Sequence, residues 1–300
     1  MLVLSRRQWL GLTAMGAVAG CRRAERNTRA PARIPYPAFR RAHPSALVRP
    51  APRPAPFDNA ALDSRFDAVR WPGPAGQMRG WLHMPSSSGP VAGLLWLHGA
   101  FAVSAAQFEP LGAAFPPRDI AVFVPAWRGE NGNPGERELL AGELDDAIAA
   151  LAWFAEQPGV DGGRLAAFGH SVGGALSALL ALMPDVPLRE TASVGGIYVP
   201  ETFARWAKTT HNGPLVRFDP HDPAEGRLRT LAGNMPDLAR PHVAYVGRDD
   251  TWFHPNIERM REAAAQSGAP FQTEYVPGDH MGSLAHGYTR YLARARGVLS

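Results

Sequence analysis

The 300 residues are enough for one large domain with additional segments, and 45% hydrophobic with 19% charged residues is ordinary for a globular protein. The net charge of +4 is unevenly placed: residues 22–57 hold nine arginines and one glutamate, whereas residues 58–300 hold 20 basic and 26 acidic side chains. No basic stripe with interleaved aromatics is present, which argues against a nucleic-acid partner. The single cysteine, Cys21, excludes an intramolecular disulfide and a cysteine-based metal site.

The first 21 residues are typical of an export signal. The stretch SRRQWL (residues 5–10) resembles the twin-arginine export motif, and the apolar run to residue 20 is too short to span a bilayer comfortably. Val18–Cys21 (VAGC) resembles the lipobox of bacterial lipoproteins, which implies a membrane anchor on Cys21. Arg22, in place of an aspartate, favours the outer membrane or the periplasmic face of a Gram-negative envelope. The alternative is a plain secretory signal with an incidental cysteine.

Residues 22–57 are rich in proline, alanine and arginine and show no helical periodicity. Proline removes backbone donors and favours an extended backbone. We therefore expect a disordered tether, with at most loose docking through Tyr36 and Phe39, between the signal peptide of residues 1–21 and a folded domain of residues 58–300.

The folded domain is expected to alternate strands with helices. The predicted strands cover residues 65–71, 78–83, 91–97, 120–124, 165–168, 192–199, 243–246 and 271–276, and the predicted helices cover 105–115, 137–156, 172–182, 255–267 and 284–294. This order predicts a mostly parallel central sheet with helices on both faces, and the first two strands add an antiparallel pair at its edge. Residues 200–240, rich in proline, glycine and aspartate, are expected to form a small, irregular, lid-like insert.

The segment Gly169–Gly173 (GHSVG) has the G-x-S-x-G pattern of a nucleophile elbow. A predicted strand leads directly into it and a predicted helix follows. A serine on such a tight turn needs glycines two residues to either side, because a larger side chain would clash with the neighbouring strand or helix. Ser171 is therefore the candidate nucleophile, and a small-residue turn without chemistry is the structural alternative.

A serine nucleophile needs an adjacent base, and this pattern orders its partners as serine, then aspartate or glutamate, then histidine. His280 ends the last predicted strand and is the candidate base. Asp250, three residues after Gly247, is the preferred acidic partner, and Asp249 remains its competitor. These loops follow the carboxyl ends of strands, where open α/β sheets place their sites.

The oxyanion formed by attack on a carbonyl would be stabilised by backbone N–H groups. Val172, directly after the nucleophile, is one candidate donor. Ala100, after the His98-Gly99 turn, is the second, with Phe101 as the alternative. The other histidines near these motifs are expected to be structural or exposed: His98, His170 and His286.

From about residue 65 to 296, this order of motifs resembles the α/β-hydrolase superfamily. Pro125–Gly135 (PAWRGENGNPG) is similar to a stretch of its prolyl-oligopeptidase-like and dienelactone-hydrolase-like members, and Ala155–Asp161 is similar to their connection into the nucleophile strand. Two departures stand out. There is no room for the β-propeller of true prolyl oligopeptidases, and Ser171 stands where dienelactone hydrolases have a cysteine.

The resemblance implies a serine hydrolase that cleaves carboxylic esters through an acyl-enzyme, with a small ester or amide substrate and no metal or organic cofactor. An amide or short-peptide hydrolase using the same residues is one alternative. A hydrolase-like module that binds a ligand or envelope partner without catalysis is another.

Two groups of side chains in the insert each allow two interpretations. Phe203, Trp206 and Phe218 either line an acyl or aryl pocket or close the insert's own small core. The stretch Asp219–Asp222 (DPHD) contains ligand-type side chains, but a loop surface is the preferred interpretation.

Overall fold

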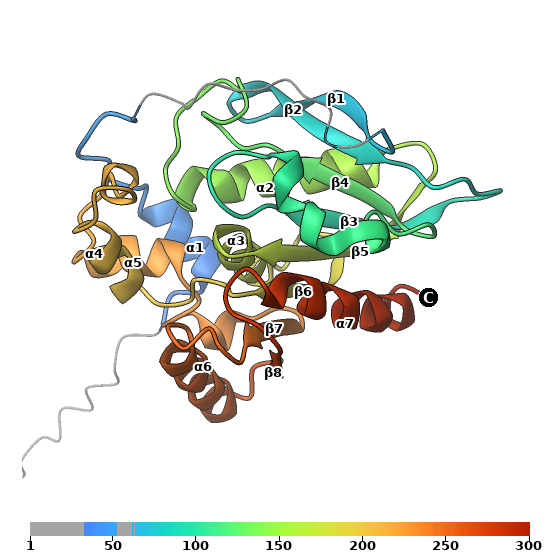
Figure 1. The fold of residues 1–300 in the computed structure, drawn as a ribbon. Helices are drawn as coiled ribbons and strands as arrows, with labels where there is room; N and C mark the ends of the chain where they lie inside the picture. The colour runs from blue at the N-terminus through green and yellow to red at the C-terminus, as the bar shows by residue number, and fades with distance from the viewer. Residues whose placement is uncertain (1–32, 53–61, 63) are drawn as a thin grey trace, which may run out of the picture. The chain divides into compact units, whose positions relative to one another are not determined.

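The strands form one mixed sheet. The computed structural model describes residues 33–52, 62 and 64–300, and in this part of the chain eight strands lie in the order β1-β2-β4-β3-β5-β6-β7-β8 (Figure 1). The strands are β1 Asp67–Gly73, β2 Gly76–His83, β3 Val91–Leu97, β4 Ala121–Pro125, β5 Val160–His170, β6 Leu188–Val194, β7 His242–Gly247 and β8 Phe271–Val276. The β1-β2 and β2-β4 pairs are antiparallel and all other neighbours are parallel. The predicted sheet, with its antiparallel edge pair, is confirmed.

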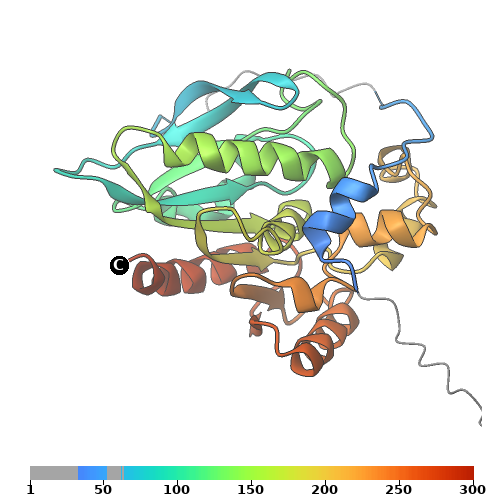
Figure 2. The ribbon, with the colours of Figure 1, turned by 180° about the vertical axis from the view of Figure 1, so that it is seen from behind.

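Helices cover both faces of this sheet, as Figures 1 and 2 show from opposite sides. The α-helices are α1 Tyr36–Ala42, α2 Ala141–Ala155, α3 Val172–Leu180, α4 Glu201–Trp206, α5 Pro223–Arg229, α6 His254–Ser267 and α7 Ser283–Val298. Short 3-10 turns are η1 Ala105–Gln107, η2 Glu109–Ala114, η3 Gly213–Leu215 and η4 Met235–Asp237. The side chains of α2, α3 and α6 share one hydrophobic cluster, and those of α7 and η2 share a second cluster.

The central strands are buried on both faces. Along β3, Leu95 and Leu97 belong to the cluster with α2 and α3, whereas Leu94 and Trp96 belong to the cluster with α7. Successive side chains of a strand point to opposite faces, so a continuous apolar run is what a doubly covered strand requires. The carboxyl ends of these strands are therefore held by packing from both sides.

Two predicted helices differ in the structure. Residues 105–115 form η1 and η2, because Gly112 has a left-handed φ of 52° that interrupts helical geometry. The helix predicted to begin at residue 137 begins at Ala141, since Leu139 and Leu140 have φ angles of 54° and 78°. Such positive angles cannot continue a right-handed helix.

The N-terminal segment from residue 34 to 52 differs from the expected disordered tether. It contains α1, whose Tyr36 side chain is fully buried and donates its hydroxyl hydrogen to Leu228 O at 2.7 Å. Arg40 forms a two-point ion pair with Asp145 at 2.7 and 2.9 Å. Tertiary packing of the two aromatics Tyr36 and Phe39 outweighs the low helix propensity that the composition suggested.

Other predictions for the N-terminus stay untested. The signal peptide and the lipidation residue Cys21 lie outside the described residues. Among the described helices, none combines the length and the apolar character that crossing a membrane requires.

The insert of residues 200–240 is more regular than expected, because it contains α4, η3, α5 and η4. Phe203 and Phe218 are buried and their rings pack edge to face at 5.6 Å, so they close a core rather than line a pocket. Trp206 is partly exposed. Asp222 caps α5 by accepting from Ala224 N–H at 2.8 Å, which agrees with the structural interpretation of this stretch.

Candidate active site

Ser171 stands on a strained turn between β5 and α3. Its φ of 55° and ψ of −116° lie outside the regions that a serine normally occupies. The turn also demands its two glycines: a Cβ at Gly169 would lie 2.0 Å from Gly173 O, and a Cβ at Gly173 would lie 2.0 Å from Leu97 O. Local strain of this kind persists only where the surroundings enforce it, and here the two-sided core does so.

A continuous line of hydrogen bonds joins Ser171 to two loops at the carboxyl edge of the sheet. His280 Nε2 lies 3.0 Å from Ser171 Oγ, and His280 Nδ1 lies 2.9 Å from Asp250 Oδ2. Because the buried carboxylate accepts the Nδ1 hydrogen, Nε2 is left to accept from the serine hydroxyl. This arrangement can activate a hydroxyl for attack on a carbonyl carbon.

The structure brings Asp250, and not Asp249, to the imidazole. Asp250 is 6% exposed, whereas Asp249 is an exposed residue whose backbone N–H donates to Gly278 O at 3.1 Å. The competition left open by the sequence is therefore resolved geometrically in favour of the residue three positions after Gly247.

Two rings and a glycine confine the His280 imidazole. Phe253 stacks on it with centroids 4.9 Å apart and planes 8° from parallel, and His170 lies on it at 5.1 Å. A Cβ at Gly195 would come within 2.8 Å of Nδ1. Sequence reasoning missed Phe253, because nothing in its local pattern indicates that the loop folds back over the histidine.

His170 holds the loop of His280 without joining the line of hydrogen bonds. Its Nε2–H donates to the backbone carbonyl of His280 at 3.0 Å. Burial, and then the neighbouring His280, lower the pKa of His170 to about 4, so it is neutral at physiological pH. The expected structural role fits this geometry, and His286 is exposed on α7, as expected.

The two predicted oxyanion donors lie next to the serine. Val172 is the first residue of α3, so its N–H has no partner within the helix. Ala100 lies on a turn with a φ of 56°, and in the described part of the chain no backbone carbonyl accepts from its N–H or from that of Phe101. A Cβ on the preceding Gly99 would lie 3.5 Å from Ser171 Cβ, which shows how closely this turn approaches the nucleophile.

His98 occupies the structural position that the sequence suggested. It is 1% exposed, donates Nδ1–H to Gly99 O at 2.9 Å and stacks on Trp127. Its Nε2 lies 3.2 Å from Glu130 Oε2, and the Glu130 side chain is 3% exposed. These contacts fix the turn that presents Ala100.

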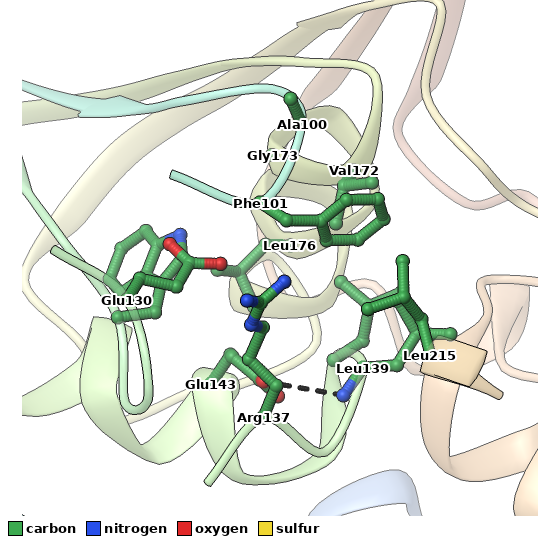
Figure 3. A pocket seen from close by; sticks show the side chains of 12 residues that line it. Ala100, Phe101, Glu130, Arg137, Leu139, Glu143, Val172, Gly173, Leu176 and Leu215 are labelled. Atoms are coloured by element: carbon green, nitrogen blue, oxygen red, sulfur yellow. Dashed lines mark hydrogen bonds between the residues drawn. The ribbon is translucent and has the colours of Figure 1, made fainter. Parts of the chain in front are cut away.

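A small pocket lies beside the two candidate oxyanion donors (Figure 3). Both Ala100 and Val172 line it, and its cavity volume is about 20 Å³. Most of the wall is apolar and is formed by Phe101, Leu139, Leu140, Leu176 and Leu215. Arg137 and Glu143 add a polar end, which sequence patterns did not indicate because it arises from a turn and the first turn of α2. Among the described residues, no cluster of three histidine, cysteine or acidic side chains could hold a metal ion.

Comparisons with known proteins give a family match and a relative. The prolyl oligopeptidase family matches residues 115–208. The uncharacterized protein MT2364 of Mycobacterium tuberculosis is 30% identical over 237 residues, which cover 76% of each chain.

Solved structures share the fold. A puromycin-hydrolyzing peptidase of Mycobacterium tuberculosis superposes with a TM-score of 0.65 at 22% identity, over 82% of this chain but only 41% of the peptidase. The Pyrococcus furiosus esterase PF2001 also superposes with a TM-score of 0.65, at 16% identity, over 85% of this chain and 98% of the esterase. The chain thus belongs to the same family as MT2364, has the α/β-hydrolase fold, and is a serine hydrolase in which residues 115–208 match the prolyl oligopeptidase family.

Proposed function

We propose that this serine hydrolase cleaves carboxylic esters with short acyl groups, using Ser171, His280 and Asp250. The observation that carries the proposal is the unbroken line of hydrogen bonds from Ser171 Oγ through His280 to the buried Asp250 carboxylate. A binding module that does not catalyse has no need of this arrangement on a strained turn beside the N–H groups of Val172 and Ala100.

The reaction proceeds in two balanced halves. Ser171 Oγ attacks the ester carbonyl carbon while its proton moves to His280 Nε2, and the N–H groups of Val172 and Ala100 stabilise the oxyanion. Collapse breaks the bond to the alcohol, which leaves with the proton from Nε2, and an acyl-enzyme remains. Water then attacks the acyl carbon, Nε2 takes its proton and returns it to Ser171 Oγ, and the carboxylic acid departs.

Asp250 has two roles in this scheme. Its carboxylate fixes the tautomer of His280 by accepting from Nδ1, and it stabilises the imidazolium that forms in each half. Phe253 acts as a positioning residue, because its parallel ring restricts His280 to the plane in which Nε2 faces Ser171.

The pocket supports short acyl groups. A volume of about 20 Å³ holds roughly one water-sized sphere, so a long acyl chain would require the walls to move. The esterase of Pyrococcus furiosus supports ester cleavage further, because this chain covers 98% of it but only 41% of the peptidase.

The test is to label the purified full-length protein with a fluorophosphonate probe, with Ser171→Ala as the control. We expect the wild type to be labelled and the substitution to abolish labelling. We also expect the wild type to turn over 4-nitrophenyl acetate at least tenfold faster than 4-nitrophenyl octanoate. Absence of labelling in the folded wild type would contradict catalysis. Comparable kcat/KM values on alanine 4-nitroanilide and the acetate would replace the ester assignment with the short-peptide one.

We also propose that the protein is exported and lipid-anchored through Cys21 to the bacterial envelope. The twin-arginine-like stretch and the lipobox-like Val18–Cys21 support this proposal. Cys21→Ser is expected to move the protein from the membrane fraction to the soluble fraction, and an unchanged membrane fraction would contradict the anchor.

A further inference from the structure

The pocket lies on the acyl side of the scissile bond. Its walls include both candidate oxyanion donors, Ala100 and Val172, and no residue of the loops that carry Asp250 and His280. Since His280 must protonate the leaving alcohol, the alcohol lies toward His280 and the acyl chain points into the pocket. Whatever lines the far end of the pocket therefore meets the far end of the acyl group.

Arg137 brings a positive charge into this pocket. Its side chain is half-buried and its guanidinium lies 5.8 Å from the centre of the Phe101 ring. Figure 3 shows the guanidinium projecting into the pocket between Glu130 and Phe101. Within the described part of the chain, no carboxylate oxygen lies within 4.0 Å of its nitrogens, unlike Arg128, which is paired with both Glu138 and Asp146.

The backbone of Arg137 is held in place from outside the pocket. Arg217, 4% exposed, donates from Nη1 to Arg137 O at 2.6 Å and from Nη2 to Glu136 Oε2 at 2.5 Å. Arg217 Nε in turn donates to Arg49 O at 2.8 Å. The guanidinium is thus presented by a fixed main chain, which lowers the entropic cost of binding a ligand.

Glu143 supplies a second polar group that lacks a partner. The residue is 5% exposed and lines the pocket, and its Oε1 accepts from the N–H groups of Glu138 and Leu139 at 2.8 and 3.2 Å. Its buried Oε2 has no hydrogen-bond partner among the described residues. A buried polar atom without a partner is costly, and a ligand group that bonds to it removes this cost.

Burial is the largest cause that raises the pKa of Glu143, to about 7. A substantial fraction of the molecules therefore carry a neutral carboxyl near neutral pH, with an O–H available as a donor. The other acidic side chain of the wall, Glu130, has its Oε2 3.2 Å from His98 Nε2, and this oxygen makes no hydrogen bond among the described residues. The polar end of the pocket can thus offer donors from Arg137 and from Glu143.

We propose that this polar end binds a carboxylate at the far end of the acyl group, so that the preferred substrates are monoesters of short dicarboxylic acids. The inference rests on the proposed ester hydrolysis at Ser171. A planar guanidinium matches a carboxylate with two parallel hydrogen bonds. Because the cavity of about 20 Å³ holds roughly one water-sized sphere, its walls must move to admit the spacer and the carboxylate, which favours a short spacer. The test therefore uses esters of succinic acid.

The test compares monoethyl succinate with ethyl succinamate, which has the same shape but an uncharged amide in place of the carboxylate. We expect wild-type kcat/KM to favour the charged ester at least tenfold. Arg137→Gln should reduce the ratio to about one, and Arg137→Lys should leave an intermediate ratio. Arg261→Gln, on the exposed face of α6 where Arg261 pairs with Glu258, is the matched control and should keep the wild-type ratio.

In the kinetic test, two outcomes would overturn the inference: a wild-type ratio of one or less, or a ratio that Arg137→Gln leaves unchanged. If neither ester is cleaved, ester hydrolysis fails and the subsite is tested by binding alone. Calorimetric titration of succinate and succinamide then applies, with at least tenfold weaker succinate binding expected in Arg137→Gln. Equal affinity of wild type and variant for succinate would overturn the inference independently of catalysis.

Discussion

The line of hydrogen bonds through Ser171 and the pocket beside it are held in different ways. Ser171, Asp250 and His280 follow strands whose core is packed from both faces, so the sheet itself fixes their spacing. The polar end of the pocket comes from a turn with two left-handed leucines and from an arginine pinned by the insert. The comparison indicates that the sheet positions the catalytic residues, whereas segments outside the sheet determine which acyl groups are selected.

The largest loss of activity should come from a substitution of Asp250, which follows a strand of the sheet. Asp250→Asn should lower kcat by about 10⁴-fold, because an amide that donates to His280 Nδ1 favours the wrong tautomer. Asp249→Asn is the matched control, since this exposed side chain does not contact the imidazole, and its kcat should remain within twofold of wild type. Steady-state kinetics on 4-nitrophenyl acetate measure both variants. Equal losses of kcat in the two variants would contradict the assignment of Asp250 as the partner of His280.

The pocket should contribute to stability in a pH-dependent way. Burial raises the pKa of Glu143 from 4.5 to about 7, so between these values the unfolded chain loses its proton while the folded chain keeps it. The wild type is therefore destabilised as pH rises from 4.5 to 7. The glutamine of Glu143→Gln does not titrate. The free energy of unfolding of this variant, relative to that of wild type, should therefore rise over this pH interval by on the order of 3 kcal/mol.

Urea unfolding of wild type and Glu143→Gln at pH 4.5, 6 and 8 measures this difference. Glu258→Gln, at an exposed position on α6, is the control. A stability difference between wild type and Glu143→Gln that does not change with pH would show that the carboxyl is not held neutral by its burial.

The smallest expected effect is that of substituting Phe253, which contacts His280 but does not line the pocket. Phe253→Leu should lower kcat about tenfold and leave KM unchanged, because it frees the His280 ring without touching the substrate pocket. Phe253→Tyr keeps the stacked ring and should restore kcat. A rise in KM with kcat unchanged would instead assign Phe253 to substrate binding.

The same division explains what the sequence could predict. Strand β3 is predicted with its observed bounds, because a doubly buried strand is a continuous apolar run between turn residues. Ser171, His280 and the aspartate pair could be identified because their chemistry requires a fixed order along a parallel sheet. The preference for Asp250 over Asp249 could not be derived from the sequence, because it depends on which carboxylate lies within hydrogen-bond distance of His280.

The remaining features depend on contacts that no local pattern contains. Arg137 and Glu143 both fall in the helix predicted for residues 137–156, and only the left-handed leucines between them turn the chain so that both line the pocket. The helix α1 lies in a proline-rich segment. It forms because the Tyr36 side chain is fully buried and donates a hydrogen bond to Leu228 O of α5. Tertiary packing decided both cases, and local propensity did not.

Arg217 also determines how this enzyme can be shortened. It bonds to Arg49 on one side and to Arg137 on the other, and Val48 N–H donates to its carbonyl oxygen at 2.7 Å. Cutting the chain at residue 58, where composition alone would put the start of the domain, removes one side of this bridge. A shortened enzyme intended to report true substrate preference should therefore retain every residue from 34 onward.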